Sequence, residues 1–360
     1  MSEEVLSTNT EPVPEEAGSQ PSRKADFKRV CAKLGLMMIA VFVFRGAATI
    51  LLSLIAPSLE TLGATMSYVV ETAISLVFLY VFPLGFTIWL FREPKKETRE
   101  RIYAKPVYFG DAMGMFPALY GVSILTNVLT MLISMLFTDA DLNKSFNTVN
   151  ELKADNMTCA VILFVQLAVI APLVEEFWFR GIVMESLRPF GNGFAIFVSA
   201  LLFGMTHANF QQFFYATALG ICLGYIAQAT KSIVTTTVMH AMFNSISGIL
   251  LMFVSSKEVE DYLLSTVTGE KSEMTPIVTA YTVYLVFIML LMAVGILMFL
   301  FKLRKIKRYR VPKAWTELTS GQRWGVFFSR ASVIVMLLLA ADTFTFRFIT
   351  SLLYKLISGE

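Results

Sequence analysis

Residues 157–184 read MTCAVILFVQLAVIAPLVEEFWFRGIVM, a mainly apolar stretch with charges near its end. A helix needs about 20 mainly apolar residues to cross the hydrocarbon core of a bilayer, so this stretch predicts a transmembrane helix. It also contains Glu175, Glu176 and Arg180. One charged side chain at the centre of a bilayer costs about 2.5–3.5 kcal/mol on insertion scales. These three charges therefore need ion-pair partners, a water-filled cavity or a functional role.

The composition of the whole chain is typical of a membrane protein. Of the 360 residues, 56% are hydrophobic and only 16% are charged, whereas a soluble domain is about 45–50% apolar. The mean hydropathy is +0.64. Cys31, Cys159 and Cys222 are far apart in the sequence, which predicts neither a disulfide framework nor a cysteine-based zinc site. The predicted fold class is all-α, a polytopic membrane helix bundle.

Apolar runs long enough to cross a bilayer recur along the chain. We expect about eight transmembrane helices and a ninth hydrophobic segment near the C-terminus. The ninth is interrupted by Asp342 and Arg347, so it would either span the membrane or lie at the interface. The runs are Leu34–Ala56, Met66–Phe91, Met113–Phe137, Met157 to about Met184, a short Gly193–His207, Phe213–Ala229, Ile233–Val254, Pro276–Phe301 and about Ala331–Tyr354.

Basic residues in the loops predict the orientation of this bundle. Cytoplasmic loops carry an excess of lysine and arginine, and such residues are concentrated in 92–105 and 302–323. The alternate loops, 138–156 and 255–275, contain few of them. The N-terminus is therefore expected on the cytoplasmic side. We interpret the basic runs as topology signals at an anionic leaflet and expect no nucleic-acid partner.

The chain is expected to form one membrane domain with a tail. Residues 1–30, which begin acidic and rich in Pro, Ser and Thr, are predicted to be a disordered cytoplasmic tail without a signal-peptide pattern. Residues 31–112 would form a two-helix transmembrane hairpin and a basic cytoplasmic loop. Residues 113–255 would form the core that carries the polar motifs, and residues 256–360 a C-terminal transmembrane extension.

Helix geometry divides the charged stretch into a pair and a single carboxylate. Residues four apart share a helix face, so Glu176 and Arg180 are expected to pair. Glu175 lies about 100° around the helix axis from Glu176 and is left to face a cavity. The alternative is a solvated, inert cluster of charges at the end of a helix.

The chain contains only two histidines, and both lie downstream in apolar surroundings. His207 ends an FxxxH pattern that begins at Phe203, and the phenylalanine would wall the site. His240 and Asn244 form an HxxxN pattern and share one helix face. Each pattern has a structural alternative, either a core histidine bonded to a neighbour or a polar contact between helices worth roughly 0.6–2 kcal/mol. Their occurrence together with the charged stretch favours a single site.

Other polar and small residues near these motifs predict local structure. Pro172 removes an i→i−4 hydrogen bond, so we expect a loosened helix just before the carboxylates. Gly220 and Gly224 form a GxxxG pattern that is typical of close helix packing. Arg45, at mid-depth in the first run, is expected to pair with Glu71 or with the carboxylates of the site.

The residue types of the three motifs suit the hydrolysis of an amide bond. A carboxylate and a histidine can hold and deprotonate a water, and a histidine with an asparagine can donate hydrogen bonds to an oxyanion. Two histidines and a glutamate can instead hold a metal ion with an open position for water. No serine or cysteine stands at a recognisable nucleophile position, and GxSxG is absent, which argues against a covalent mechanism; HExxH is absent as well.

The ordered set EExxxR, FxxxH and HxxxN on successive runs resembles the CPBP family. This family contains relatives of type II CAAX prenyl proteases and bacteriocin-processing enzymes, also called Abi proteins. The motifs occupy residues 175–244. The resemblance implies that Glu175 and His207 activate a water. It also implies that His240 and Asn244 stabilise the oxyanion.

The resemblance further implies supporting roles and a choice of cofactor. Glu176 and Arg180 match supporting positions of the family, and Phe203 with Phe179 would wall a substrate pocket. Members are described both as metalloproteases and as metal-free glutamate enzymes, so the expected cofactor is either none or one divalent metal such as zinc. The ligands of such a metal would be Glu175, His207 and His240.

The leading functional hypothesis is an intramembrane (metallo)endopeptidase whose cavity opens toward the cytoplasm. Its partners would be the lipid bilayer and a peptide or lipidated-protein substrate. Its location would be the bacterial cytoplasmic membrane, as an integral multi-pass protein. The alternative is a non-catalytic membrane scaffold or bacteriocin self-immunity protein with the same fold. A proton-coupled transporter predicts inverted repeats, whereas the polar motifs occur in one region only.

Overall fold

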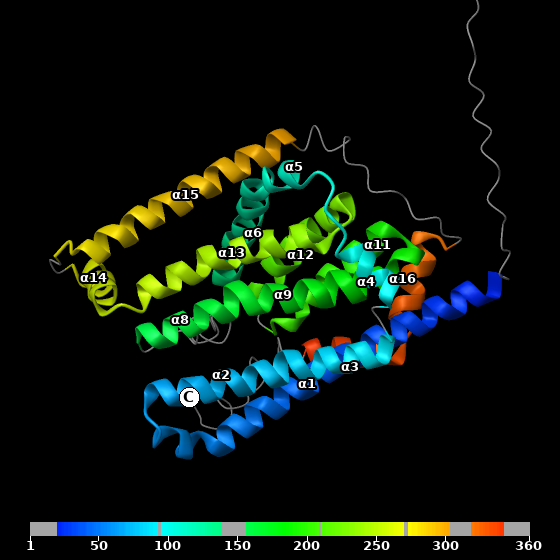
Figure 1. The fold of residues 1–360 in the computed structure, drawn as a ribbon, viewed down its shortest axis with the longest axis horizontal. Coiled ribbons are helices and arrows are strands. Elements are labelled where there is room, and N and C mark those ends of the chain that lie inside the picture. The colour runs from blue at the N-terminus through cyan, green and yellow to red at the C-terminus, as the bar shows by residue number, and fades with distance from the viewer. Residues whose placement is uncertain are drawn as a thin grey trace, which may run out of the picture.

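The fold is a bundle of helices in the part of the chain that the computed structural model describes (Figure 1). The described residues are 20–92, 95–137, 156–208, 210–269, 273–302 and 318–341. Within them, seven helices are long and apolar enough to cross a membrane, and a bent pair near the C-terminus would make eight. The predicted all-α polytopic bundle is therefore confirmed. The seven are Arg23–Glu60, Ala64–Phe91, Phe109–Leu132, Met157–Phe190, Gln212–Thr230, Ile233–Val254 and Pro276–Phe301.

The N-terminal hairpin consists of two long arms that lie side by side (Figure 1). The chain reverses at Gly63, whose φ of 77° lies in the left-handed region that favours glycine. The first arm is α1, Gln20–Glu60, and the second contains α2, Ala64–Leu76, η1, Val77–Val81, and α3, Phe82–Phe91.

The prediction of a disordered tail over residues 1–30 is wrong for its last third, because α1 already begins at Gln20. Phe27 explains the difference. Its side chain is fully buried, and its ring lies 4.7 Å from the ring of Phe190. This apolar anchor stands among basic residues, so composition alone does not reveal it. Residues 1–19 lie outside the described residues.

Short helices lie between or at the ends of the spans, and the sequence pattern does not predict them. The first two, α4 (Lys96–Ile102) and α5 (Phe109–Met113), precede the long α6 (Phe116–Phe137). The third, α14 (Lys257–Thr268), lies in the predicted loop 255–275. Of the other predicted loops, residues 138–155 and 303–317 lie outside the described residues.

The span that carries the charged stretch is a continuous helical path with two π-helical parts. Its elements are α8 (Met157–Val165), η3 (Gln166–Ile170), α9 (Ala171–Glu175), η4 (Glu176–Met184), α10 (Glu185–Leu187) and η5 (Arg188–Phe190). In a π-helix each N–H bonds to the carbonyl five residues back, and such turns are rare.

Proline accounts for the position of η3. The N–H of Ala171 bonds to the carbonyl of Gln166, five residues back. The next residue is Pro172, which has no N–H to continue the pattern. In the N-terminal hairpin, η1 stands in the same place relative to Pro83. The predicted loosening of the helix at Pro172 is therefore confirmed.

Three further helices complete the region of the polar motifs. They are α11 (Asn192–Thr206), α12 (Phe210–Thr230) and α13 (Ile233–Val254). With 15 residues, α11 is about 22 Å long, shorter than the roughly 30 Å hydrocarbon core. A Cβ atom at Gly220 of α12 would lie 3.0 Å from the Cα of Ala200 in α11, which confirms close packing at this glycine.

The C-terminal part contributes one long helix and a bent pair. Helix α15, Pro276–Lys302, packs along α6 (Figure 1). Helix α16, Ser320–Phe328, meets the helix Ala331–Ala341 at an angle of 74°. The predicted ninth segment therefore starts at Ala331, as expected. Its remainder, 342–354, lies outside the described residues, as do the predicted interruptions at Asp342 and Arg347.

The largest apolar core surrounds η4. All residues of η4 except Phe177 are buried, and side chains from α1, α11 and α16 pack against them. Representative members are Phe27, Met38, Phe179, Ile182, Phe203 and Phe327. The polar motifs therefore stand next to the most tightly enclosed part of the bundle.

Candidate active site

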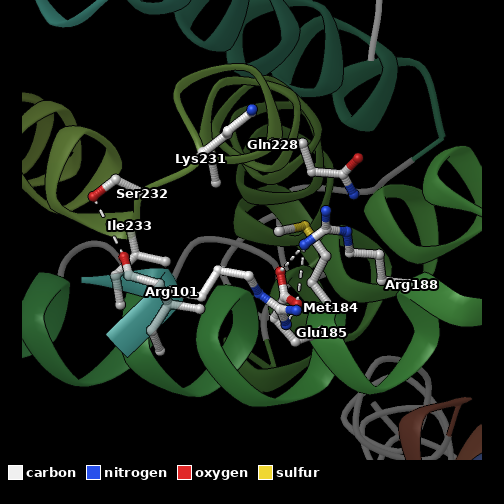
Figure 2. A pocket seen from close by; sticks show the side chains of 10 residues that line it. Arg101, Met184, Glu185, Arg188, Gln228, Lys231, Ser232 and Ile233 are labelled. Atoms are coloured by element: carbon white, nitrogen blue, oxygen red, sulfur yellow. Dashed lines mark hydrogen bonds and ion pairs between the residues drawn. The ribbon is translucent and has the colours of Figure 1, made fainter. Parts of the chain in front are cut away.

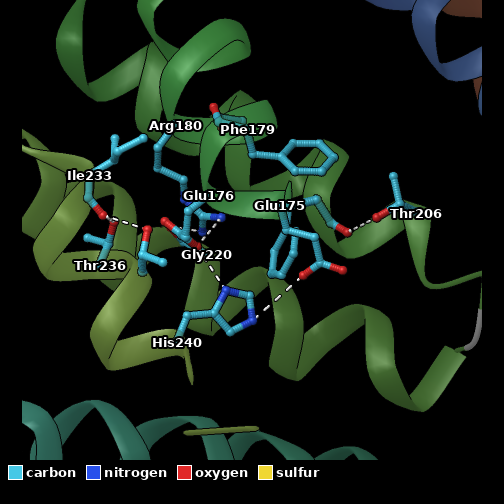
Figure 3. A network of polar contacts seen from close by, with 12 residues as sticks. Glu175, Glu176, Phe179, Arg180, Thr206, Gly220, Ile233, Thr236 and His240 are labelled. Carbon is cyan, nitrogen blue, oxygen red and sulfur yellow. Dashed lines mark hydrogen bonds and ion pairs between the residues drawn. The ribbon is translucent and has the colours of Figure 1, made fainter. Parts of the chain in front are cut away.

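Glu176 and Arg180 form a buried ion pair at the start of η4 (Figure 3). Nη1 of Arg180 lies 2.9 Å from Oε1 of Glu176, and the two side chains are 1% and 0% exposed. This is the pair that the i,i+4 spacing predicts, and it is confirmed. Removing one member of such a pair typically costs 3–5 kcal/mol, because an unpaired charge stays buried.

Arg180 is held by two further contacts. Its Nη2 donates a hydrogen bond to the carbonyl oxygen of Gly220 at 3.2 Å. Its guanidinium carbon lies 4.8 Å from the centre of the Phe203 ring, a cation–π distance. The flat, forked guanidinium can make all these contacts at once, which a lysine ammonium cannot.

His240 lies between the two glutamates. Its Nδ1 lies 2.9 Å from Oε1 of Glu176, and because the carboxylate paired with Arg180 can only accept, Nδ1 is the donor. The other nitrogen, Nε2, lies 3.7 Å from Oε2 of Glu175, which is beyond direct hydrogen-bond distance. The prediction left Glu175 to face a cavity, about 100° around the helix from Glu176. Both carboxylates approach the same imidazole ring.

Glu175 is the partly accessible carboxylate of the network, with a side chain that is 12% exposed. Its Oε1 accepts a hydrogen bond from the hydroxyl of Tyr80 at 3.0 Å. Tyr80 belongs to η1, so the N-terminal hairpin reaches into the site. Tyr80 could not be predicted from the sequence, because it is one of 12 tyrosines and stands in no motif.

His207 follows α11 directly and is held in one tautomer. Its Nδ1 lies 3.0 Å from the carbonyl oxygen of Phe203, and since a carbonyl only accepts, Nδ1 carries the proton. In the neutral ring Nε2 is therefore free to accept a proton. Next to it, the carbonyl of Thr206 accepts a hydrogen bond from Nη1 of Arg45 at 3.2 Å. Arg45 thus contacts the backbone beside His207.

Asn244 is tied to the irregular part of the charged span. Its Nδ2 donates to the carbonyl oxygen of Leu167 at 2.8 Å. That carbonyl lacks a donor from its own helix, because the N–H of Ala171 bonds to Gln166 and Pro172 has none. The asparagine therefore satisfies a backbone acceptor that the π-helical turn leaves unpaired. The second N–H of the same amide remains for another acceptor.

The two predicted pocket residues lie in the core rather than at a surface. Phe179 and Phe203 are each 1% exposed, and their rings lie 5.3 Å apart. The ring of Phe203 also stands edge-on to both imidazoles, 5.0 Å from His207 and 5.7 Å from His240. Phe203 therefore packs against both histidines, and a substrate pocket at these residues stays a prediction.

The donor set does not fit a metal ion in the arrangement seen. In the part of the chain that the structure describes, no three His, Cys, Asp or Glu side chains are grouped so that they could hold one. Glu175 and His240 approach each other, but His207 does not complete a ligand set with them. We therefore assign no chemical step to a metal.

A cavity of about 70 Å³ lies further along the same span (Figure 2). It contains Glu185, which forms ion pairs with Arg101 of α4 and, at 3.3 Å, with Arg188. Glu175 and His240 are not among its lining residues, which are Arg101, Ile102, Met184, Glu185, Arg188, Ala227, Gln228, Lys231, Ser232 and Ile233. The ion pairs connect the loop after the hairpin to the charged span.

The fold and the network together define a polytopic helical membrane protein with a Glu, His and Asn site at the meeting point of its helices. Residues 157–246 match the family model described as "Type II CAAX prenyl endopeptidase Rce1-like". The match runs from α8 into α13 and includes all three motifs. The predicted resemblance is confirmed over this segment. The N-terminal hairpin lies outside the match.

One curated relative is a protein of Bacillus subtilis (strain 168) named "Putative membrane peptidase YdiL". It is 26% identical over 110 residues, which is 30% of this chain and 43% of the relative. The chain thus spans less than half the length of the curated relative it matches. No solved structure matches the chain.

Proposed function

We propose that the chain is an intramembrane endopeptidase that hydrolyses a peptide bond with a water activated by Glu175 and His207. The observation that carries this proposal is that the partly accessible Glu175 carboxylate lies 3.7 Å from Nε2 of His240, so the proposed base and the proposed oxyanion donor face each other. A water about 2.8 Å from Oε2 of Glu175 would lie next to this donor. The family match of residues 157–246 supports a peptidase reaction at this position.

The reaction starts with a water bound to Glu175. The carboxylate takes one proton of the water, and Nε2 of His207 accepts a hydrogen bond from the other. The water oxygen then forms a bond with the peptide carbonyl carbon. Glu175 passes its proton to the amide nitrogen, and the carbon–nitrogen bond breaks. General acid–base help of this kind contributes typically 10²–10⁴-fold to a rate.

His240 and Asn244 would stabilise the oxyanion that forms from the peptide carbonyl. In its doubly protonated form, His240 donates from Nε2 while Nδ1 remains on Glu176. Asn244 donates the N–H that Leu167 does not use. Loss of one oxyanion donor lowers kcat about 10²–10³-fold in other enzymes. Glu176 and Arg180 would hold His240 and remain charged throughout.

The substrate class we propose is a peptide or lipidated protein that reaches the site from the membrane. The network lies among membrane-spanning helices, and exposed apolar side chains cover much of the bundle. We retain the expectation that the cavity opens toward the cytoplasm of a bacterial cell, and the predicted basic loops support this orientation.

The test compares membrane and secreted peptides from cells that produce the wild type, Glu175→Gln or Glu258→Gln. Glu175→Gln keeps the size and one acceptor of the side chain but removes the base, so peptides that depend on the wild type should be lost. Glu258 is an exposed residue of α14, and its variant should process like the wild type. Equal processing by purified Glu175→Gln protein would refute the proposed mechanism. A scaffold or immunity function would be favoured if all motif variants complement a deletion strain.

A further inference from the structure

Tyr80 is the contact through which the N-terminal hairpin reaches the candidate catalytic carboxylate. Its hydroxyl donates to Oε1 of Glu175 at 3.0 Å across 95 positions of sequence. Tyr80 lies well before residues 157–246, which match the family. The hydrogen bond is therefore a feature of this chain that the matched segment does not contain.

The π-helical turn of η1 places Tyr80 where it can make this contact. The N–H of Phe82 bonds to the carbonyl of Val77, five residues back, and Pro83 follows. Such a turn changes the direction of the side chains within it compared with an α-helix, and π-bulges are frequent at functional sites. On the charged span, η3 ends shortly before Glu175. Irregular turns thus lie on both sides of the hydrogen bond.

The hydrogen bond divides the two oxygens of Glu175 between two tasks. Oε1 is occupied by Tyr80, and Oε2 faces Nε2 of His240 at 3.7 Å. A glutamate side chain has several rotatable bonds, and without the hydroxyl its carboxylate can turn toward His240 and close that separation. Oε2 would then no longer be free to hold the water.

A second contact from the same hairpin acts beside His207. Nη1 of Arg45 in α1 donates to the carbonyl of Thr206 at 3.2 Å. Both candidate water-activating residues are therefore approached by the hairpin, Glu175 directly and His207 through the preceding peptide. A purely structural hairpin would not need polar contacts at both of these positions.

We propose that Tyr80 is a positioning residue that orients the Glu175 carboxylate and keeps it apart from His240. This inference rests on the proposed peptidase function. It predicts that the hydroxyl contributes to turnover and not to substrate binding, because Tyr80 acts through Glu175. A displacement of about 1 Å in a catalytic group can cost 10²-fold in rate.

The experiment uses full-length protein and a synthetic peptide chosen because its cleavage is lost in Glu175→Ala membranes. In Tyr80→Phe, kcat should fall about 10-fold or more while KM stays within twofold and Tm within a few degrees of the wild type. Tyr284→Phe is the matched control, since Tyr284 donates to the carbonyl of Ile246 on α13 at the same 3.0 Å. Its kcat should be unchanged.

The outcomes separate this inference from the function on which it rests. If Glu175-dependent cleavage exists and Tyr80→Phe has wild-type kcat and KM, the positioning role is refuted and the peptidase function remains. If KM rises while kcat is unchanged, Tyr80 contacts substrate instead, which also refutes positioning. If no peptide depends on Glu175, the proposed function fails and the role of Tyr80 fails with it.

Discussion

The side-chain amide of Asn244 makes one structural hydrogen bond and is proposed to make a second one to the oxyanion of the reaction. One N–H of its amide satisfies the carbonyl of Leu167, which Pro172 leaves without a donor. The other is proposed to face the oxyanion. A buried carbonyl without a partner costs about 1–3 kcal/mol, so the structural bond alone would be a reason to keep an amide here.

We expect Asn244→Ala to lose both stability and turnover. The unpaired carbonyl of Leu167 should lower the free energy of unfolding by about 1–3 kcal/mol, and loss of an oxyanion donor should lower kcat about 10²-fold or more. Thermal unfolding in detergent and the peptide cleavage assay measure the two effects separately.

Ser245→Ala is the control for Asn244→Ala. The neighbouring hydroxyl of Ser245 donates only to the carbonyl of Ala241 in its own helix, at 2.7 Å. Its removal should change neither quantity greatly. If Asn244→Ala is destabilised but turns over peptide at the wild-type rate, the asparagine is structural alone.

At the residue scale, contacts within a motif could be predicted from the sequence, and contacts between distant segments could not. The spacing of Glu176 and Arg180 fixes their pairing, because the helix brings positions four apart together. The contacts of His240 with both glutamates depend on how α13 packs against η4, which local spacing does not contain. Tyr80 gives no signal at all, because tyrosines are common in membrane spans and its partner is 95 positions away.

At the scale of elements, the same local pattern of a π-helical turn followed by a proline occurs twice. In each case five π-helical residues end shortly before a proline, at Pro83 and at Pro172. The turn before Pro172 leaves the carbonyl of Leu167 to accept a hydrogen bond from Asn244. It also changes the direction in which the following side chains point. Helix irregularity thus sets the direction in which Glu175 points.

We expect Pro172→Ala to improve the helix and impair the site. Alanine restores an N–H and is about 3 kcal/mol more favourable than proline inside a helix, so Tm should be unchanged or higher. A more regular helix would rotate Glu175 away from His240, and kcat should fall at least about 10-fold. Thermal unfolding and cleavage kinetics measure both quantities.

Pro57→Ala is a matched control for this change. Pro57 also lies inside a helix, α1, but its side chain is exposed and contributes nothing to the network. Its variant should have wild-type kcat. Full activity in a stabilised Pro172→Ala protein would show that the irregular turn is dispensable.

Span positions could be predicted because apolar length is a strong signal. The run Ile233–Val254 coincides with α13, and most other spans differ from prediction by a few residues at their ends. The π-helical turns could not be located, since the hydrophobic pattern does not indicate whether a backbone N–H bonds to the carbonyl four or five residues back. Helix α14 could not be predicted from apolar length, because Glu258, Glu260 and Asp261 stand in its first turns.

At the scale of the molecule, α15 packs against α6, and glycines lie at the contact between the two helices. A Cβ at Gly121 of α6 would lie 2.6 Å from the backbone nitrogen of Ile296, and one at Gly295 of α15 would meet the carbonyl oxygen of Pro117. Little of α15 is buried, and at these glycines its backbone directly approaches that of α6.

We expect Gly295→Ala to loosen α15 without removing the chemistry. The added methyl group must push the helices apart because it meets backbone atoms, and overpacking of this kind costs about 1–3 kcal/mol. Tm should fall while Glu175-dependent cleavage persists at low temperature. Gly85→Ala, where a Cβ meets nothing within 4 Å, should leave Tm unchanged or raise it. An unchanged Tm in Gly295→Ala would contradict the proposed contact.

The short α11 has a consequence for the surrounding lipid. Its 15 residues span about 22 Å, several ångströms less than the hydrocarbon thickness of a typical bilayer. Such hydrophobic mismatch is relieved when the membrane thins around the protein, at fractions of a kcal/mol per ångström. His207 stands at the end of this helix, so we expect shorter acyl chains to bring the histidine closer to the headgroups and to water.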